Sequence, residues 1–360
     1  MTDREPTRHG TPVGLLALGA LLLAACSSMG PRTVACDRFR YGDAMSRSTK
    51  QQMLMNLVRM RYMEPPAFVE VSSMIDQFGR EGRISGAAGW NTALPQLADT
   101  QNLGAGARWS DRPTITYTPL SGQKFARSLL TPLTPEMLFA LVQAGWPAEV
   151  LLGLTVRSIN GVRNETASPA NRQYADPEFA ELIRIWTRLR NAGALSLRLA
   201  QSEPRQGVVA FSQASRRHSG LERDFARLRE ILGLPAGNEF KLIYGLAPTE
   251  PTDIAILSRS TMEVMANLAW YFEVPPEHVA SGRTLATFRS KSTTMVPKVR
   301  VYHSRERPSD AFAAVSSRGY WFYLEDTDVV SKQTFFALEL LMSLTDTEHE
   351  TLGPVVAIGG

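Results

Sequence analysis

The sequence predicts an α+β fold, and three observations carry that prediction. After residue 195, strand-like segments come in pairs between helix-like segments, which favours mainly antiparallel sheet. Before that point, apolar residues recur at helical spacing, which indicates a helical N-terminal part. A Gly- and Ala-rich stretch, 82–110, interrupts this part with two alternating segments typical of a β-hairpin. The 360 residues are 44% hydrophobic and 21% charged, an ordinary globular balance.

Helices are expected on both sides of the hairpin. The first should cover about 47–63, and its apolar face consists of Met53, Leu57 and Met60. Short strands are expected at 68–71 and 114–118. Thr134-Pro135 is an N-cap followed by proline at the first helical position, and another helix should follow Pro147.

The second half alternates helices and strands. Helices are expected from Asp176-Pro177, at the capping boxes Ser219…Glu222 and Ser260…Glu263, and over 329–344. Strands are expected near 195–199, 208–211, 240–244, 254–257, 299–302, 311–315, 320–324 and 355–358. A tight turn at Ser317-Arg318-Gly319 should join two of them. The loop 160–175 is a plausible boundary between a helical region with the hairpin, 46–165, and an α+β domain, 170–360.

The N-terminus has the pattern of an export signal. Residues 13–25 are uncharged and mostly apolar, but a membrane-spanning helix needs about 20 such residues. This length is typical of a signal-peptide core, so 1–25 is expected to be removed. The run ends in Leu23-Ala24-Ala25-Cys26, which resembles the lipobox of bacterial lipoproteins.

That resemblance implies that Cys26 carries lipid and that signal peptidase II cuts between Ala25 and Cys26. Residues 26–45 would then form a tether. Ser27 follows the cysteine, which in lipoproteins of enteric type resembles export to the outer membrane. Two or three acyl chains, at about 0.8 kcal/mol per buried methylene, would make the anchor permanent. Cys36 then has no partner in its own chain and should be a free thiol or bridge to another chain.

Three longer segments are similar to an uncharacterised group of envelope lipoproteins from Gram-negative bacteria. They are QQMLMNLVRMRYMEPPAFVEVSS (51–73), YTPLSGQKFARSLLTPL (117–133) and RGYWFYLEDTDVVSKQTF (318–335). The resemblance implies a location in the cell envelope and no particular activity.

No catalytic, cofactor or metal site is predicted. The mature histidines are scattered, at His218, His278, His303 and His349. Glu348-His349-Glu350 beside Asp346 could bind a cation, although a solvated turn explains it better. There is no G-x-S-x-G elbow and no phosphate loop.

Two features offer binding surfaces. The most basic stretch could contact anionic headgroups or glycans, although a solvated face is the preferred interpretation; it contains Arg283, Arg289, Lys291, Lys298, Arg300, Arg305 and Arg307. The aromatic run 320–323 could stack on sugar, but alternate strand residues point to opposite faces, so a buried sheet explains it more simply. The net charge of +4 is too small to predict nucleic-acid binding.

Three functions remain open. The first is an interaction or assembly role for a lipid-anchored envelope protein with a protein partner. The second is a subunit of an oligomeric outer-membrane pore, built from hairpin 82–110. One face of its arms is expected to hold Ile84, Gly86, Ala88 and Trp90, with Leu103, Ala105, Ala107 and Trp109. The third is an enzyme acting on envelope glycans. A projecting hairpin would favour the pore, and a cleft with convergent polar groups would favour the enzyme.

Overall fold

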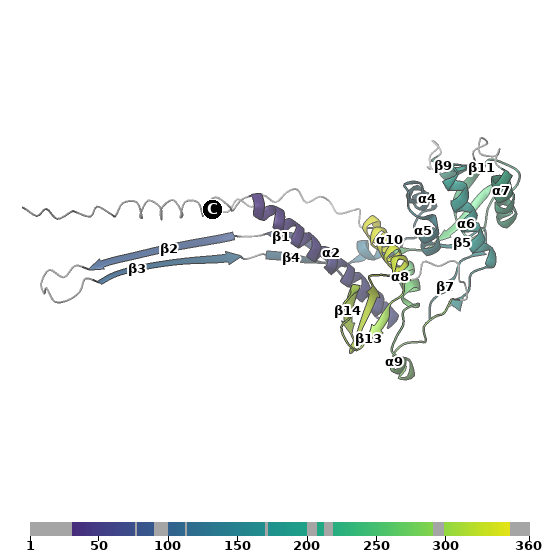
Figure 1. Ribbon diagram of the computed structural model, residues 1–360. Coiled ribbons are helices and arrows are strands. Elements are labelled where there is room, and N and C mark those ends of the chain that lie inside the picture. Colours follow the sequence, from purple (N-terminus) through teal and green to yellow (C-terminus); the bar gives the residue numbers. More distant parts are fainter. Residues whose placement is uncertain are drawn as a thin grey trace, which may run out of the picture.

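A computed structural model describes residues 31–75, 78–89, 100–111, 114–169, 172–199, 207–211, 219–290 and 299–345. These residues form helices and mostly antiparallel sheets, so the predicted α+β class is confirmed. Figure 1 shows a body of packed helices and sheets, and two elements that leave it toward the same side. They are the first described helix and a long two-stranded ribbon.

That helix, α2 (Pro31–Arg61), begins well before the predicted start at residue 47. Part of the segment predicted as a tether is therefore helical. Its C-terminal half is buried, with Met53, Leu54, Leu57 and Val58 in the core. Once these packed turns have formed, each residue added toward the N-terminus gains one hydrogen bond without a new nucleation cost. The apolar spacing identified the packed half and could not mark the exposed half.

The ribbon consists of four strands in two antiparallel pairs. β1 (Phe68–Ile75) pairs with β4 (Thr114–Leu120), and β2 (Phe78–Gly89) pairs with β3 (Thr100–Asp111). The predicted Gly-rich hairpin is thus confirmed, and the two strands expected beside it extend it toward the body.

The largest sheet has six strands in the order β6–β5–β12–β11–β10–β9. Their bounds are β5 (Val156–Ile159), β6 (Val162–Arg163), β9 (Leu195–Leu199), β10 (Gly207–Phe211), β11 (Glu239–Tyr244) and β12 (Asp253–Ser258). Neighbours are antiparallel except β11 and β12, which are parallel. β7 (Thr166–Ala167) and β8 (Arg172–Gln173) form a separate short pair.

Helices cover the sheets and supply many of the buried side chains. They are α3 (Gln123–Leu130), α4 (Pro135–Gln143), α5 (Ala148–Thr155), α6 (Pro177–Asn191), α7 (Ser219–Leu232), α8 (Thr261–Ala269), α9 (Pro276–Ala280) and α10 (Val329–Thr345). Two predicted N-caps are present: the Thr134 hydroxyl accepts the amide of Met137, and the Ser260 hydroxyl accepts the amide of Glu263.

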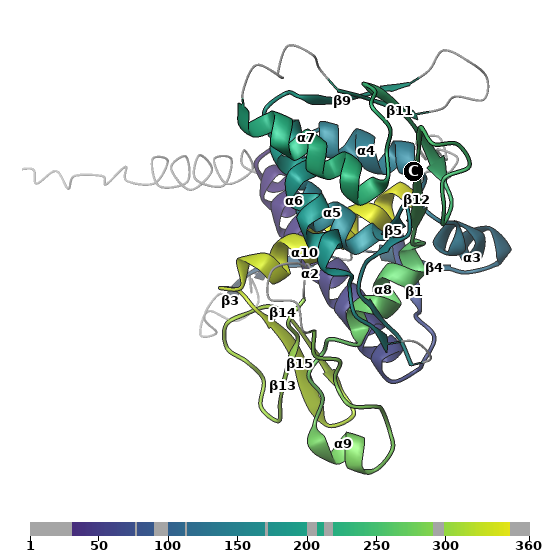
Figure 2. The same cartoon turned by 90° about the vertical axis from the view of Figure 1, so that its right-hand side faces the viewer.

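A second sheet has three strands in the order β13–β15–β14. β14 (Ala311–Ser317) and β15 (Tyr320–Glu325) are joined by the predicted tight turn, in which Arg318 and Gly319 both have positive φ, 55° and 82°. β13 (Tyr302–Ser304) begins three residues later than predicted. Figure 2 shows this sheet and α9 together at one end of the body.

Two main apolar clusters hold the body together. One packs α4–α7 on the six-stranded sheet around Trp186, and the other packs α2, α8 and α10 on the three-stranded sheet around Phe322. Each cluster contains residues from both sides of loop 160–175, so the two regions predicted from the sequence share their cores.

Candidate functional site: the two-stranded ribbon

The outer ladder of the ribbon keeps the register found at the outer end of the stem. Ile75 is opposite Thr114 at the end of the β1–β4 pair, and Phe78 is opposite Asp111 at the start of the β2–β3 pair. The offset between partners is the same on both sides, so the second ladder continues the first. At about 3.3 Å per residue, the arm from Phe68 to Gly89 is about 70 Å long. Figure 1 shows it extending far beyond the body.

The register brings together the two alternating segments noted in the sequence. Ile84 is opposite Ala105, and Gly86 is opposite Leu103. Trp109 is opposite Arg80, nearer the body, while Trp90 lies outside the described residues. Neither edge of the ribbon pairs with another strand in the described part of the chain. Both edges therefore offer a row of backbone donors and acceptors.

The stem of the ribbon, β1 and β4, is attached to the body at its base. Phe68 is buried and packs edge-on against Phe125 of α3, with ring centroids 5.6 Å apart. The Gln52 side chain of α2 accepts the Val69 amide and donates to the Val69 carbonyl, each at 2.8 Å. These contacts fix the direction in which the ribbon leaves the body.

Beyond this base the stem is exposed. Every residue of β4 from Thr114 to Pro119 is exposed. On the face opposite Phe68, Val69 and Tyr117 are 40% and 62% exposed. A bulge between Val71 and Ser73 bends the strand, and the Ser72 hydroxyl there donates to the Thr116 carbonyl at 3.3 Å. The stem thus has the backbone of a sheet without a core beneath it.

Helix α2 runs from the same point toward the same side (Figure 1). From Gln52 back to Pro31 the helix is about 30 Å long. From Val69 out to Phe78 the ribbon also measures about 30 Å. The first residue of α2 therefore lies near the level at which β2 begins, and Cys26 is five residues before it in the sequence.

Apart from the ribbon, a cluster of polar side chains lies where α9 meets β15. The Tyr62 hydroxyl and His278 Nδ1 share a hydrogen bond of 2.6 Å, and the Tyr320 hydroxyl donates to the Glu277 carboxylate. That bond, with the nearby Arg305, holds the pKa of Glu277 below its usual range. Burial, followed by the charge of Arg283, lowers the pKa of His278. The imidazole is therefore neutral at pH 7.

This cluster includes part of the basic stretch found in the sequence. Arg305 is 3.0 Å from the Glu277 carboxylate, and Arg318 pairs with Glu64. Both arginines also lie over aromatic rings, those of Tyr320 and Tyr62. Of the basic stretch, Arg305 is thus paired with an acid. Lys291 and Lys298 lie outside the described residues.

Two buried arginines carry structural roles that the sequence does not signal. Arg61 donates to the Phe272 and Leu285 carbonyls and the Thr284 hydroxyl, and burial lowers its pKa to about 10. Its guanidinium lies over the Trp270 ring, 4.6 Å from the centroid. The arginine therefore ties the end of α2 to the segment that follows α8.

The second arginine, Arg259, is completely buried, which lowers its pKa to about 10. It donates to the carbonyls of Leu154 and Glu165 at 2.8 and 2.6 Å. The Glu165 carboxylate in turn accepts the hydroxyls of Tyr271 and Ser290, each at 2.7 Å. All of these partners are polar groups of the protein itself, so the network fits a role in holding the core together.

The aromatic run on β15 alternates as expected. Tyr320 and Phe322 are buried, while Trp321 and Tyr323 are half-buried on the opposite face. Trp321 lines an open hollow of about 420 Å³ beside α2, together with Gln51, Gln52 and Met55. The side chain of Gln52 is already committed to the base of the ribbon.

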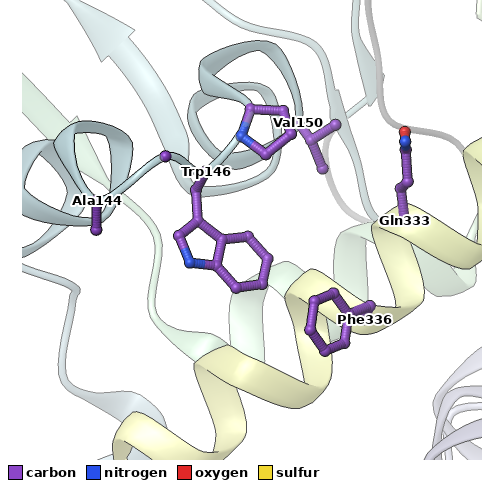
Figure 3. Close-up of a pocket in the computed structure, with 7 residues that line it drawn as sticks. Ala144, Trp146, Val150, Gln333 and Phe336 are labelled. Atoms are coloured by element: carbon purple, nitrogen blue, oxygen red, sulfur yellow. The ribbon is translucent and has the colours of Figure 1, made fainter.

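Figure 3 shows another hollow, of about 340 Å³, between the turn after α4 and α10. Trp146 stacks on Phe336 with ring centroids 5.1 Å apart, and Val150 and Gln333 complete much of the lining. The lining is apolar apart from Gln333 and contains no acid, base or nucleophile.

Of the other residues identified from the sequence, some lie outside the part of the chain that the structure describes and some lie within it. Ala25, Cys26, His218 and the group around His349 lie outside the described residues. Cys36 lies on α2, and His303 is half-buried on β13, 5.8 Å from the Tyr320 ring centroid. None of the described helices is both long and apolar enough to cross a bilayer.

Comparison of the chain with models of protein families, with curated proteins and with solved structures finds no match. The interpretation of function therefore rests on the ribbon and on the sequence of the N-terminus.

Proposed function

We propose that the chain is a lipid-anchored cell-envelope protein, held in the outer membrane through Cys26, whose role is assembly through its ribbon. The observation that carries the assembly role is the long two-stranded ladder of β1–β4 and β2–β3, neither edge of which pairs with another strand in the described part of the chain. A two-stranded sheet without a core is at best marginally stable in water. Its open edges gain the most from pairing with further strands.

The anchor is tested by Cys26→Ala in the full precursor, with labelled palmitate and membrane fractionation. We expect loss of the label and release of the protein from the membrane fraction. Cys36→Ser is the matched control and should keep both the label and the membrane location. A Cys26→Ala chain that still incorporates palmitate contradicts the assignment.

The assembly role is tested by crosslinking in intact envelopes. The wild-type chain should form crosslinked species above the monomer mass. A variant in which Asn-Gly replaces residues 76–113 should give monomers only, because it keeps the stem and loses the long ladder. Equal crosslinking of both chains contradicts a role for the ribbon.

A second candidate function is a subunit of an outer-membrane pore, and two measurements favour it. The arms of β2 and β3 have 12 residues each, while a tilted strand crosses a bilayer with about 9–11. They also begin near the level of the first residue of α2, which the lipid on Cys26 would hold close to the membrane surface. In lipid every backbone group needs a partner, so several ribbons would have to close into a ring.

Alternation along the middle of the ladder resembles that of such a ring. One set of alternate positions holds Ile84, Gly86, Ala88, Leu103, Ala105 and Ala107, with Gln101 and Arg80 toward its two ends, and the other holds Glu81, Arg83, Ser85, Ala87, Asn102 and Arg108. In a closed ring of strands the first set would face lipid and the second the water-filled interior. Single cysteines at Ala88 and Ala105, probed with a lipid-soluble label in native membranes, test this. Labelling from water alone at both positions rules the pore out and leaves the assembly role.

The third hypothesis, an enzyme acting on envelope glycans, gains no support from the hollow beside Trp146, whose lining has no acid or base.

A further inference from the structure

The two most exposed large apolar side chains among the described residues are Phe39, at 74%, and Tyr117, at 62%. Phe39 lies on the N-terminal half of α2, and Tyr117 lies on the stem strand β4. Both belong to the elements that leave the body toward the same side (Figure 1). Other exposed apolar side chains, such as Leu246 and Val329 at 61% each, lie on the body. What distinguishes Phe39 and Tyr117 is that both stand on elements that leave it.

The helix half that carries Phe39 has no cover within the described chain. From Arg38 to Thr49 every side chain is exposed except that of Tyr41, which is half-buried. This half is held by backbone hydrogen bonds that extend from the packed half, and burial of side chains adds little to it. The exposed half of α2, like the stem, therefore has apolar side chains available to a partner.

Distances measured outward from the body identify the part of the stem that lies level with Phe39. Gln52 is bonded to Val69, so this contact gives a common origin for both elements. Phe39 lies about 20 Å from it along the helix. Ile115 pairs with Met74 and lies about 17 Å from it along the ribbon. Ile115 is 38% exposed. Together with Tyr117 it forms a small exposed apolar surface on the stem, at about the same distance from the body as Phe39.

We propose that Phe39 on α2 of one copy packs against Ile115 and Tyr117 on the stem of the next copy. The inference rests on the lipid anchor of the proposed function, because copies anchored in one membrane share one orientation and one height. Residues at equal height then face each other between neighbours.

The two sides of this contact are different surfaces. A helix of one copy meets a stem of the next, so the contact is heterologous and repeats from copy to copy, in a closed ring or an open row, instead of ending at a dimer. It places neighbouring ribbons beside one another. It does not require that they cross the bilayer.

The test uses cysteine crosslinking of the full lipidated chain in native membranes, in a Cys36→Ser background. Phe39→Cys combined with Ile115→Cys should give a ladder of dimer, trimer and higher species under a short bifunctional maleimide. Mixed membranes of the two single variants should give dimers only. Phe39→Cys combined with Val330→Cys is the matched control, since Val330 is 56% exposed on α10 of the body, and it should give no ladder.

Absence of the ladder from the Phe39/Ile115 pair, with Cys26 still labelled by palmitate, overturns the contact and leaves the anchor intact. Dimers from Phe39→Cys alone also overturn it, because they show a symmetric helix–helix contact. As an independent readout, Phe39→Asp should shift the detergent-solubilised protein from oligomer to monomer, while Val330→Asp should not. An unchanged oligomer in Phe39→Asp contradicts the proposal.

Discussion

Strand β12 in the body pairs with a strand on each of its edges, whereas strand β4 in the ribbon pairs with β1 alone. Their surroundings are also opposite. All but one residue of β12 are buried, whereas all but one residue of β4 are exposed. The backbone hydrogen bonds are similar in kind, but each contributes little net stability because water competes for the same groups. The apolar surface buried by side chains stabilises β12, and β4 has almost none. The body is thus stabilised by its own core, whereas side-chain burial contributes little to the stem of the ribbon.

The glycines of the ribbon sharpen this contrast. β2 contains Gly79, Gly82, Gly86 and Gly89 within twelve residues. Glycine weakens a strand because it loses more backbone freedom on ordering and has no side chain to pack. Such a sequence tolerates close approach of neighbouring strands but does not hold a ladder together by itself.

The largest expected effect comes from a core side chain of the body. Trp186→Ala removes a fully buried ring that packs 4.8 Å from Phe139, and it should lower the free energy of unfolding by about 3–5 kcal/mol. Tyr117→Ala, the control on the stem, should change it by less than about 0.5 kcal/mol in the unlipidated chain from Ser27. Urea denaturation measures both. Equal losses would mean that the stem is also packed.

Loss of the buried guanidinium should have the next largest effect. Arg61→Ala leaves the Phe272 and Leu285 carbonyls and the Thr284 hydroxyl without their donor, which should cost about 2–4 kcal/mol by urea denaturation. Arg59→Ala, two residues earlier and only partly buried, is the control and should cost under about 1 kcal/mol. If Arg61→Lys fully restores stability, the planar fork of donors is not what matters.

A smaller effect should appear on acidification. Burial lowers the pKa of His278 in the folded protein below its unfolded value of about 6.5. The unfolded chain then binds the proton more readily, so this contribution to stability is present above pH 6.5 and is lost as the pH falls toward the folded pKa. His278→Gln should reduce the difference in urea midpoint between pH 7.5 and 5.5. His303→Gln is the control, and an unchanged difference in His278→Gln contradicts the assignment.

The smallest effect is expected from removing the outer ribbon. Replacing residues 76–113 by Asn-Gly closes β1 and β4 with a two-residue turn. In the unlipidated chain the melting temperature of the body should move by less than about 2 °C, measured by calorimetry, because no core side chain is lost. A fall of more than about 5 °C would show that the hairpin stabilises the body after all.

Local patterns in the sequence predicted most elements of the body. Thr134-Pro135 and Ser260 mark helix starts because their hydroxyls cap the first amides, an interaction between residues three apart. The turn at Arg318-Gly319 is likewise local. Asn160-Gly161, interpreted as part of a loop, is the turn of the β5–β6 hairpin, with φ of 45° and 83°. An Asn-Gly pair is typical of a two-residue hairpin turn, but β6 has only two residues and shows no strand pattern in the sequence.

Other features were missed because they depend on distant partners. The parallel pairing of β11 with β12 departs from the antiparallel pairing inferred for strands that follow one another closely. The extension of the hairpin by β1 and β4 could have been suspected, because the two strands flank it at nearly equal distances. Nothing near Arg61 or Arg259 indicates burial, since their acceptors come from residues that are about a hundred or more positions away.

The sequence by itself determined the α+β class, the Gly-rich hairpin and the expectation of a lipidated Cys26, because each depends on spacing and residue type within a short window. The tertiary structure alone decided that β2 and β3 keep the register of the outer end of β1 and β4, and that the N-terminal half of α2 lies exposed. It also decided which charges are buried. These outcomes depend on which distant surfaces pack together, and periodicity along the chain indicates which face is apolar without naming the surface that covers it.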